Sequence, residues 1–396
     1  MSPAEDNNSA HVMVVAGEAS GDLHAANMVR AMRRMDPGLR FSGMGGSALR
    51  SAGVEILVDS TRLSVVGLVE VLVHYRDIRR ALATLRTGLQ RERPALLVLV
   101  DYVEFNLRLA RTAKRLGIRV LFYVSPQVWA WRSRRVKRIG RVIDAMAVLF
   151  PFEAEVYRRH GIPVRYVGNP LVDEVHASSD RHTLRREFGL DEAAPVVGIL
   201  PGSRRGEVSR HLPLIMEAGR LLRARIPDVQ FIMPLAPGVD VARDVTPHMD
   251  PCLNIVQITG RTYDAMHSAD ALMIASGTAT LEAGLLRVPM AILYRVSPIT
   301  YFIIKRLILI RNVGLANIVA GERVVPEFIQ NDATPENIAD EIERLLTNPN
   351  YARAMRERLG VIREKLGSGG GSDNVARMAL ELIETGELAR ISHHRS

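Results

Sequence analysis

The sequence lacks several features that would place it in a common class of protein. It has one cysteine, Cys252, in 396 residues, so no disulfide forms within the chain and no cysteine cluster holds a metal. Zinc-finger spacing, an aromatic stacking signature and a basic tail are also missing, which argues against a nucleic-acid-binding protein. The motif G-x-G-x-x-G of dinucleotide-binding folds does not occur at the first glycine turn.

Long apolar runs are missing as well. The longest, residues 303–310, is interrupted by Lys305 and Arg306 and is shorter than the ~20 residues that a membrane-spanning helix needs. The N-terminal residues are polar, and the apolar stretch at residues 11–16 runs into glycine and acidic residues without a cleavage site, so we expect no signal peptide. These absences predict a cytoplasmic protein that does not cross a membrane.

The charge of the chain is positive. Its 52 Lys and Arg residues exceed its 43 Asp and Glu residues, which gives a formal net charge of +9. Such a surface attracts anions, and phosphorylated small molecules or an anionic bilayer are the partners we expect. An alternative is that the high arginine content merely reflects a GC-rich genome.

Short runs rich in Val, Ile and Leu recur along the chain, each followed by a turn and a segment of helical periodicity. This alternation is typical of α/β domains with doubly wound parallel sheets. The length predicts two such domains. The expected strands are residues 12–16, 54–58, 96–100, 120–124 and 145–150 in the first half, and 196–200, 230–234, 253–256, 271–274 and 290–294 in the second.

The domain boundary is predicted within a polar linker at residues 167–191. We assign residues 1–170 to the first domain and 171–366 to the second. Residues 367–396 begin with a glycine-rich hinge and continue into an apolar helix, which we expect to dock back on the first domain. Such a hinge permits a homodimer formed by exchange of this helix.

The first motif is G-E-A-S-G-D at residues 17–22, between the first strand and a helix. Backbone amides of Gly17, Ser20 and Gly21 lie where a helix dipole favours an anion. The carboxylates of Glu18 and Asp22 favour contacts with hydroxyl groups, or base chemistry, over a phosphate site. The alternative is that Ser20 or Asp22 merely caps the helix.

Asp101 follows the apolar run 94–100 directly, and Glu104 and Asn106 come in the next turn. A carboxylate at the carboxyl end of a buried strand is well placed to take a proton from a sugar hydroxyl. A structural role as a helix cap is the alternative.

Both tryptophans of the chain lie in the loop Y-V-S-P-Q-V-W-A-W-R at residues 123–132. Indole rings pack on sugar rings or acyl chains, and Arg132 is suited to a phosphate, with Ser125, Gln127 and Trp129 beside it. A purely structural role for this loop is the alternative. The basic run that follows, which contacts anionic lipid headgroups or is merely solvated, is Arg132, Arg134, Arg135, Lys137 and Arg138.

Two strand-to-helix turns in the second half suit a diphosphate. In L-P-G-S-R, the amides near Gly202 and Ser203 face a phosphate and Arg204 supplies a fixed positive charge. With no metal-binding cluster in the sequence, these groups would stabilise a departing diphosphate.

The second turn is S-G-T-A-T-L-E at residues 276–282. Ser276, Gly277 and Thr278 offer hydroxyls and amides at a helix start, and Glu282 is placed to accept hydrogen bonds from the two ribose hydroxyls. The alternative for Thr280 is an ordinary helix cap.

The segment 63–72 is too densely apolar for one face of a helix, and Arg76, Arg79 and Arg80 follow it. It is either fully buried or inserted into lipid with its arginines at the headgroups.

Seven segments of the chain, taken in order, resemble the lipid-A-disaccharide synthase family. They are GEASGD, SGMGG (42–46), residues 63–72, YVSPQVWAWR, PGSR, SGTATLE and residues 317–330. The resemblance implies a GT-B fold, in which two Rossmann-like domains face a cleft and the C-terminal helix returns to the first domain. It implies transfer of 2,3-diacylglucosamine from UDP onto 2,3-diacylglucosamine 1-phosphate, giving UDP and a β-1,6-linked disaccharide. It further implies that no metal or other cofactor is required and that the enzyme acts as a peripheral protein at the cytoplasmic face of the inner membrane.

Carried onto these positions, the resemblance implies that Asp101 is the base for the acceptor 6-hydroxyl, with Glu18 as the second candidate. It implies that Asn317 joins the UDP-binding residues of the second domain, together with Arg204 and Glu282. It also favours lipid contact over burial for the apolar segment. The membrane-contacting residues would then be Val65, Val66, Leu68, Val69 and Leu72.

Three positions depart from the family pattern. The chain has D-Y-V-E-F-N at 101–106 where D-A-P-D-F-N is common, Asn169 where the family has His, and Ala316 where it has Pro. A paralogue that uses another lipid-linked acceptor therefore stays open. A UDP-sugar 2-epimerase stays open as well, although it would need no acceptor and no apolar segment. A third alternative is a UDP-sugar-binding protein without catalytic activity, which would not need Asp101 and Glu18.

Overall fold

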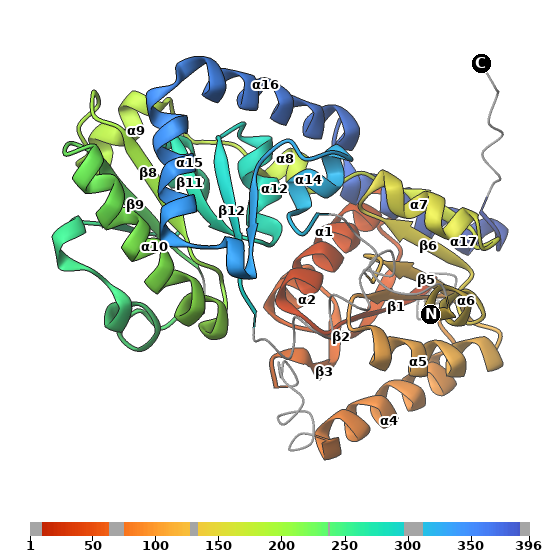
Figure 1. Ribbon diagram of the computed structural model, residues 1–396. Coiled ribbons are helices and arrows are strands. Elements are labelled where there is room, and N and C mark those ends of the chain that lie inside the picture. The colour runs from red at the N-terminus through yellow and green to blue at the C-terminus, as the bar shows by residue number, and fades with distance from the viewer. Residues whose placement is uncertain (1–9, 63–74, 127–133, 237, 297–311, 389–396) are drawn as a thin grey trace, which may run out of the picture. The chain divides into compact units, whose positions relative to one another are not determined.

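The computed structural model describes residues 10–62, 75–126, 134–236, 238–296 and 312–388 (Figure 1). The chain divides into two compact units. Unit 1 consists of Met1–Pro170 together with Gly369–Ser396, and unit 2 consists of Leu171–Ser368.

Unit 1 is built on a seven-stranded sheet in the order β3-β2-β1-β4-β5-β6-β7, and neighbouring strands are parallel. The order reverses direction at β1 and β4, which is the place where ligands bind in folds of this class. The strands are β1 (His11–Ala16), β2 (Arg40–Gly45), β3 (Glu55–Asp59), β4 (Leu96–Val100), β5 (Arg119–Tyr123), β6 (Ala145–Val148) and β7 (Val164–Tyr166).

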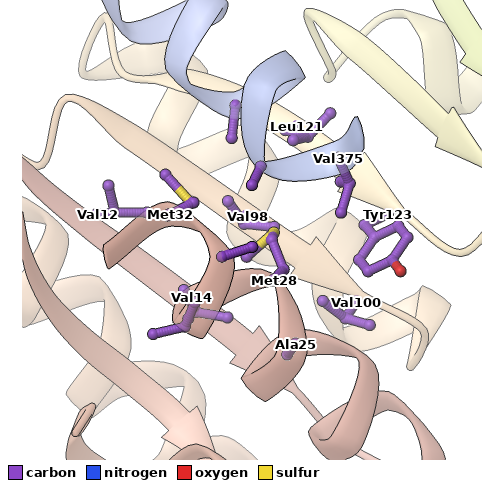
Figure 2. Close-up of a cluster of buried hydrophobic side chains, with 14 of the residues drawn as sticks. Val12, Val14, Ala25, Met28, Met32, Val98, Val100, Leu121, Tyr123 and Val375 are labelled. Carbon is purple, nitrogen blue, oxygen red and sulfur yellow. The ribbon is translucent and has the colours of Figure 1, made fainter. Parts of the chain in front are cut away.

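Helices cover both faces of this sheet, so its central strands are apolar on both sides. Val12 and Val14 of β1 pack in one core, whereas Met13 and Val15 pack in the other. The helices of the first face are α1 (Ala19–Met35), α2 (Ser47–Ser51) and α17 (Gly371–Thr385), and those of the second are α4 (Tyr75–Glu92), α5 (Val103–Arg115), α6 (Arg134–Gly140) and α7 (Pro151–Arg158). Figure 2 shows the first core, with Val12, Val14, Ala25, Met28, Met32, Val98, Val100, Leu121, Tyr123 and Val375 labelled.

Helix α17 is part of unit 1 although it comes from the end of the chain. Val375 and Leu382 are fully buried in the first core. Arg165 forms a two-pronged ion pair with Glu381, at 2.7 and 3.2 Å. The guanidinium of Arg119 donates to the carbonyl oxygens of Leu382 and Ile383, both at 2.9 Å, and so caps the carboxyl end of α17.

Unit 2 contains a six-stranded parallel sheet in the order β10-β9-β8-β11-β12-β13. The strands are β8 (Val196–Leu200), β9 (Gln230–Leu235), β10 (Val256–Thr259), β11 (Ala271–Ala275), β12 (Met290–Tyr294) and β13 (Glu327–Ile329). The helices are α8 (Leu171–Glu174), α9 (Arg181–Glu187), α10 (Arg205–Arg225), α11 (Thr262–Ser268), α12 (Thr278–Leu285), α14 (Leu315–Ala320), α15 (Pro335–Thr347) and α16 (Pro349–Leu366).

The structure confirms the prediction of two doubly wound parallel sheets. Three strands were not predicted, namely β2, β7 and β13, because β2 reads R-F-S-G-M-G without an apolar run and the other two have three residues each. Strand β10 begins at Val256, three residues later than expected. Within the described residues, none of the helices is both long and apolar enough to span a bilayer.

Candidate active site

The candidate base lies at the carboxyl end of the central strand of unit 1. Strand β4 lies between β1 and β5, so the turns that follow these three strands meet at one edge of the sheet. Gly17 follows β1, Asp101 follows β4 and Val124 follows β5. The backbone N–H of Gly17 donates to Oδ1 of Asp101 at 3.2 Å. The other carboxylate oxygen, Oδ2, is buried and accepts no hydrogen bond from the described residues.

The backbone around Asp101 is strained. Asp101 has a φ of 49° and Tyr102 a φ of 35°, so two successive residues with side chains adopt the left-handed region. The β-branched Val124 has a φ of 67° at the neighbouring turn. Asn106 is fully buried and its amide donates to the carbonyl oxygens of Val100 at 3.1 Å and Asp101 at 2.8 Å. This side chain holds the strained turn in place, and strain of this kind gathers at functional sites.

Burial changes the acid–base chemistry of Asp101. It raises the pKa of the carboxyl group to about 7, against the opposing effect of the Gly17 amide, and the negative charges of Glu18 and Asp22 raise it further. A carboxylate with a pKa near neutrality is a stronger base than an ordinary aspartate and is still substantially ionised at pH 7. Glu18, by contrast, is exposed and occupies the N-cap position just before α1, without a capping hydrogen bond from its side chain.

The structure gives Asp22 internal partners. Its buried carboxylate accepts hydrogen bonds from the amides of Gly46 at 2.7 Å and Ala48 at 2.9 Å, at the start of α2. Asp22 therefore joins α1 to the segment S-G-M-G-G. Of the other residues in the motif, Gly21 is buried and Ser20 is exposed.

The loop after β5 is described as far as Pro126. The hydroxyl of Ser125 is buried, donates to the carbonyl oxygen of Pro126 at 2.8 Å and lies 2.9 Å from the hydroxyl of Tyr157. Several predicted site residues lie outside the described residues: Gln127, Trp129 and Arg132 of this loop, and Val65, Val66, Leu68, Val69 and Leu72 of the apolar segment.

Part of the basic run is paired with an acidic side chain. Glu104, at the start of α5, contacts Arg135 at 2.9 Å and Arg138 at 3.7 Å, both on α6. These ion pairs are largely exposed, so they contribute little to stability. They partly neutralise the positive charge of α6.

In unit 2, the turn between β8 and α10 is closed by a side chain of its own helix. Gly202 has a φ of 125°, which favours glycine. The amides of Ser203 and Arg204 both donate to Oε2 of Glu207, at 3.0 and 3.3 Å. The guanidinium of Arg204 lies 3.6 Å from Oε1 of the same carboxylate and is 69% exposed.

The turn between β11 and α12 is open by comparison. No side chain of the described residues caps the amides at the start of α12, and a Cβ added at Gly277 would meet nothing within 4 Å. Thr278 is exposed, whereas Ser276 donates to the carbonyl oxygen of Val313 at 2.8 Å. The side chain of Thr280 is fully buried and donates to the carbonyl oxygen of Gly277 at 2.8 Å, so it holds the turn from within.

Glu282 lies in a group of polar side chains. The hydroxyl of Tyr263 on α11 donates to its Oε1 at 3.5 Å. Burial raises the pKa of Glu282, the hydrogen bond from Tyr263 lowers it, and the charge of Glu174 on α8 raises it again. Burial likewise raises the pKa of Glu174.

Asn317 is fully buried on α14. Its amide donates to the carbonyl oxygen of Val325 at 2.9 Å and to Glu327 at 2.8 Å, and its oxygen accepts from the amides of Val324 and Val325. Glu327 in turn accepts from the amide of Gly314 at 2.9 Å. Asn317 thus orders the chain between α14 and β13.

Comparison with known sequences gives the family of this chain. The sequence pattern of the lipid-A-disaccharide synthetase family matches residues 12–369. The lipid-A-disaccharide synthase of Geobacter sulfurreducens is 51% identical over 379 residues, which cover 96% of this chain and 98% of that protein. The chain belongs to the lipid-A-disaccharide synthase family. The lipid-A-disaccharide synthase of Nitrosococcus oceani is 44% identical and covers 98% of this chain and 100% of its own length. The predicted resemblance is therefore confirmed.

Solved structures of other proteins share the fold of this family member. The UDP-GlcNAc 2-epimerase of Neisseria meningitidis bound to UDP-GlcNAc has a TM-score of 0.65 at 13% identity, and covers 94% of this chain and 100% of that one. The glycotransferase of kitacinnamycin has a TM-score of 0.64 at 17% identity, and covers 95% and 100%. These likenesses confirm the GT-B class of the fold.

Several residues of the site were not predicted from the sequence. Tyr263 and Glu174 approach Glu282 from two other helices. His211 on α10 is buried, and its ring contacts the carbonyl oxygen of Pro201 after β8 at 2.9 Å and accepts from the amide of Arg295 after β12 at 3.1 Å. No spacing in the sequence signals these contacts, because each joins segments distant along the chain. Glu207 follows the predicted L-P-G-S-R segment by one helical turn, which is the spacing of a capping box.

Proposed function

We propose that this protein is a lipid-A-disaccharide synthase. It transfers 2,3-diacylglucosamine from UDP-2,3-diacylglucosamine to 2,3-diacylglucosamine 1-phosphate, giving the β-1,6-linked disaccharide 1-phosphate and UDP. Membership of the family over residues 12–369 supports this reaction. The observation that carries the chemistry is the buried carboxylate of Asp101, whose pKa of about 7 suits a base at neutral pH.

Asp101 acts on the acceptor. Its carboxylate takes the proton of the acceptor 6-hydroxyl as the oxygen bonds to the anomeric carbon of the donor, and the bond from that carbon to the diphosphate breaks. A single displacement of this kind inverts the anomeric configuration. The Asp101 carboxylate has capacity for this proton, because Oδ1 accepts from the amide of Gly17 at 3.2 Å and Oδ2 accepts no hydrogen bond from the described residues. Glu18 is the second candidate for this role.

Unit 2 binds the UDP part of the donor. The uncapped amides at the start of α12 take the diphosphate, together with Gly277 and Thr278, and Arg204 supplies positive charge. Gly202, Ser203 and Ser276 belong to the turns that form this site, and Glu282 accepts hydrogen bonds from the ribose hydroxyls. Thr280 and Asn317 position these turns from within, since both side chains are fully buried.

The charge of the leaving diphosphate is stabilised by these amides and by Arg204, so the proposed reaction needs no metal. The described residues contain no group of three or more His, Cys, Asp or Glu side chains arranged around a common point. Activity in the presence of a chelator tests this part of the proposal.

The acylated substrates require contact with a membrane. We assign this contact to the apolar segment at residues 63–72, with Trp129 and Arg132 near the acyl chains and the phosphate of the acceptor. We assign the rest of the acceptor-binding site to residues of the G-E-A-S-G-D motif and of the loop at residues 123–132, namely Gly17, Ser20, Gly21, Ser125 and Gln127. Asp22 positions α2 beside them. The enzyme would then work as a peripheral protein at the cytoplasmic face of the inner membrane. Exchange of α17 between two copies is a further possibility of the glycine hinge, whereas in this structure α17 packs on α1 of its own chain.

A UDP-sugar 2-epimerase is the alternative from another class, because epimerases share the fold. The experiment that separates the two uses purified protein with UDP-2,3-diacylglucosamine, with and without 2,3-diacylglucosamine 1-phosphate, in EDTA. We expect a disaccharide phosphate by mass spectrometry only when the acceptor is present. Conversion of the donor without acceptor would favour the epimerase, and UDP binding without product would indicate a paralogue with another acceptor.

A further inference from the structure

We infer that Glu207 is an internal anion that competes with the diphosphate of UDP for Ser203 and Arg204, and so limits the affinity of the enzyme for its product. This inference rests on the proposed binding of UDP by unit 2. It adds a role for a residue that the proposed reaction does not use.

The carboxylate of Glu207 occupies the turn that would otherwise receive an anion. One of its oxygens accepts from the amides of both Ser203 and Arg204, at 3.0 and 3.3 Å. The other lies 3.6 Å from the guanidinium of Arg204. Two amides at the start of a 21-residue helix and one arginine are thus directed to a single carboxylate.

Gly202 leaves room for this arrangement. A Cβ added there would lie 2.5 Å from the Cβ of Glu207 and 2.7 Å from its Oε2, which is closer than atoms approach. The glycine therefore allows the Glu207 side chain to fold back over the turn. The Glu207 side chain is 29% exposed, so an incoming anion can reach it and displace it.

The turn before α12 provides the contrast. Its helix start has no capping side chain among the described residues, and Gly277 faces open space. In the proposed diphosphate site, the amides before α12 can bind the ligand directly, because no side chain of the described residues competes for them. The amides before α10 can bind it only after the Glu207 carboxylate has moved away. When UDP leaves, Glu207 again accepts hydrogen bonds from the amides of Ser203 and Arg204 and pairs with the Arg204 guanidinium.

The diphosphate and Glu207 carry charges of the same sign. A carboxylate that stays near Arg204 repels the bound diphosphate, and one that moves away loses its hydrogen bonds. Either way, the negative charge of Glu207 weakens the binding of UDP. Removal of that charge should therefore tighten binding of the diphosphate and leave binding of the nucleoside unchanged.

The test is calorimetric titration of wild type, Glu207→Gln, Glu207→Ala and the control Glu217→Gln with UDP, UMP and uridine. Glu217 is exposed on the same helix about three turns further on, so its substitution makes the same change in net charge. We expect both Glu207 variants to bind UDP about three- to tenfold more tightly than wild type, with a smaller gain for UMP and none for uridine. Glu217→Gln should match wild type.

If Glu207 served only as a structural cap of α10, the variants would behave differently. Loss of a capping side chain would lower the midpoint of thermal unfolding and leave UDP binding unchanged or weaker, in Glu207→Ala more than in Glu207→Gln. That pattern, with UDP binding intact in the wild type, would overturn the competition. Absence of UDP binding in the wild type would instead refute the proposed function of unit 2.

Discussion

The carboxylate of Asp101 occupies the space in which a side chain of Gly21 would stand. A Cβ added at Gly21 would overlap Oδ2 of Asp101, so the first turn of α1 lies directly against the candidate base. Gly21 and Asp101 are far apart in the sequence, and β1 and β4 bring them together by pairing in the sheet. The absence of a side chain at Gly21 therefore leaves the space that the Asp101 carboxylate occupies.

Gly21→Ala should impair transfer without impairing UDP binding. The added methyl group displaces the Asp101 carboxylate, and a shift of about 1 Å in a catalytic group costs on the order of a hundredfold in rate. Steady-state kinetics would show a lower kcat, while titration with UDP would give the wild-type Kd. Gly88→Ala is the control, since a Cβ there approaches the flexible ends of Met13 and Leu57, at 3.0 and 3.4 Å. Unchanged kcat in Gly21→Ala would mean that the position of Asp101 is not critical.

Tyr263→Phe should weaken the binding of UDP. The hydroxyl of Tyr263 donates to Glu282, and its loss leaves that carboxylate free to turn away from the ribose. We expect a Kd for UDP about three- to tenfold higher and a smaller change for 2′-deoxy-UDP, because the missing hydroxyl reduces the role of Glu282. Tyr351→Phe removes a similar hydrogen bond, to Glu341 at 2.8 Å, elsewhere in unit 2 and serves as the control. Equal effects on both ligands would argue against a ribose contact of Glu282.

Asp22→Asn should destabilise unit 1. The carboxylate accepts from the amides of Gly46 and Ala48 in a buried position, and an asparagine amide group cannot accept at both positions. We expect the free energy of unfolding to fall by about 2 kcal/mol. Denaturant titration monitored by circular dichroism measures this change. Asp36→Asn, at an exposed turn where the carboxylate accepts from Gly38, should cost much less.

Asp101→Asn should stabilise the protein at alkaline pH. Because the pKa of Asp101 is raised to about 7 in the folded state, this group favours folding at low pH, and that contribution is lost as the pH rises from about 4 to about 7. Above pH 7 the folded wild type carries a buried charge that asparagine lacks. The variant should therefore gain roughly 2–3 kcal/mol relative to wild type between about pH 5 and about pH 8. An equal difference at both pH values would show that Asp101 titrates like an exposed aspartate.

The central parts of both sheets could be predicted because their strands are continuous apolar runs. Strands β4 and β8 lie at residues 96–100 and 196–200, as expected. Strand β2 could not be predicted in this way. Gly43 stands in it because a Cβ there would collide with the carbonyl group of Val14, and this contact depends on the pairing of two strands.

The position of Asp101 after β4 followed from the sequence, whereas its environment did not. Its left-handed backbone and the contacts of Asn106 depend on packing between β4 and α5. The environments of Thr280 and Asn317 could not be predicted either, although Thr280 lies in a predicted ligand-binding turn and the family resemblance implied that Asn317 binds UDP. Their burial arises from neighbours in α14 and β13 that no local pattern encodes.

The dependence of the transfer rate on pH tests the role of Asp101 most directly. Wild type and Asp101→Asn would be compared under single-turnover conditions from about pH 5 to about pH 9, with UDP binding measured in parallel. We predict that the wild-type rate rises with pH and levels off above about pH 7, as the carboxylate loses its proton. Asp101→Asn should be about 10²- to 10⁴-fold slower, without this inflection and with an unchanged Kd for UDP. A variant rate within a few fold of wild type, or the same inflection in the variant, would contradict the assignment of Asp101 as the base.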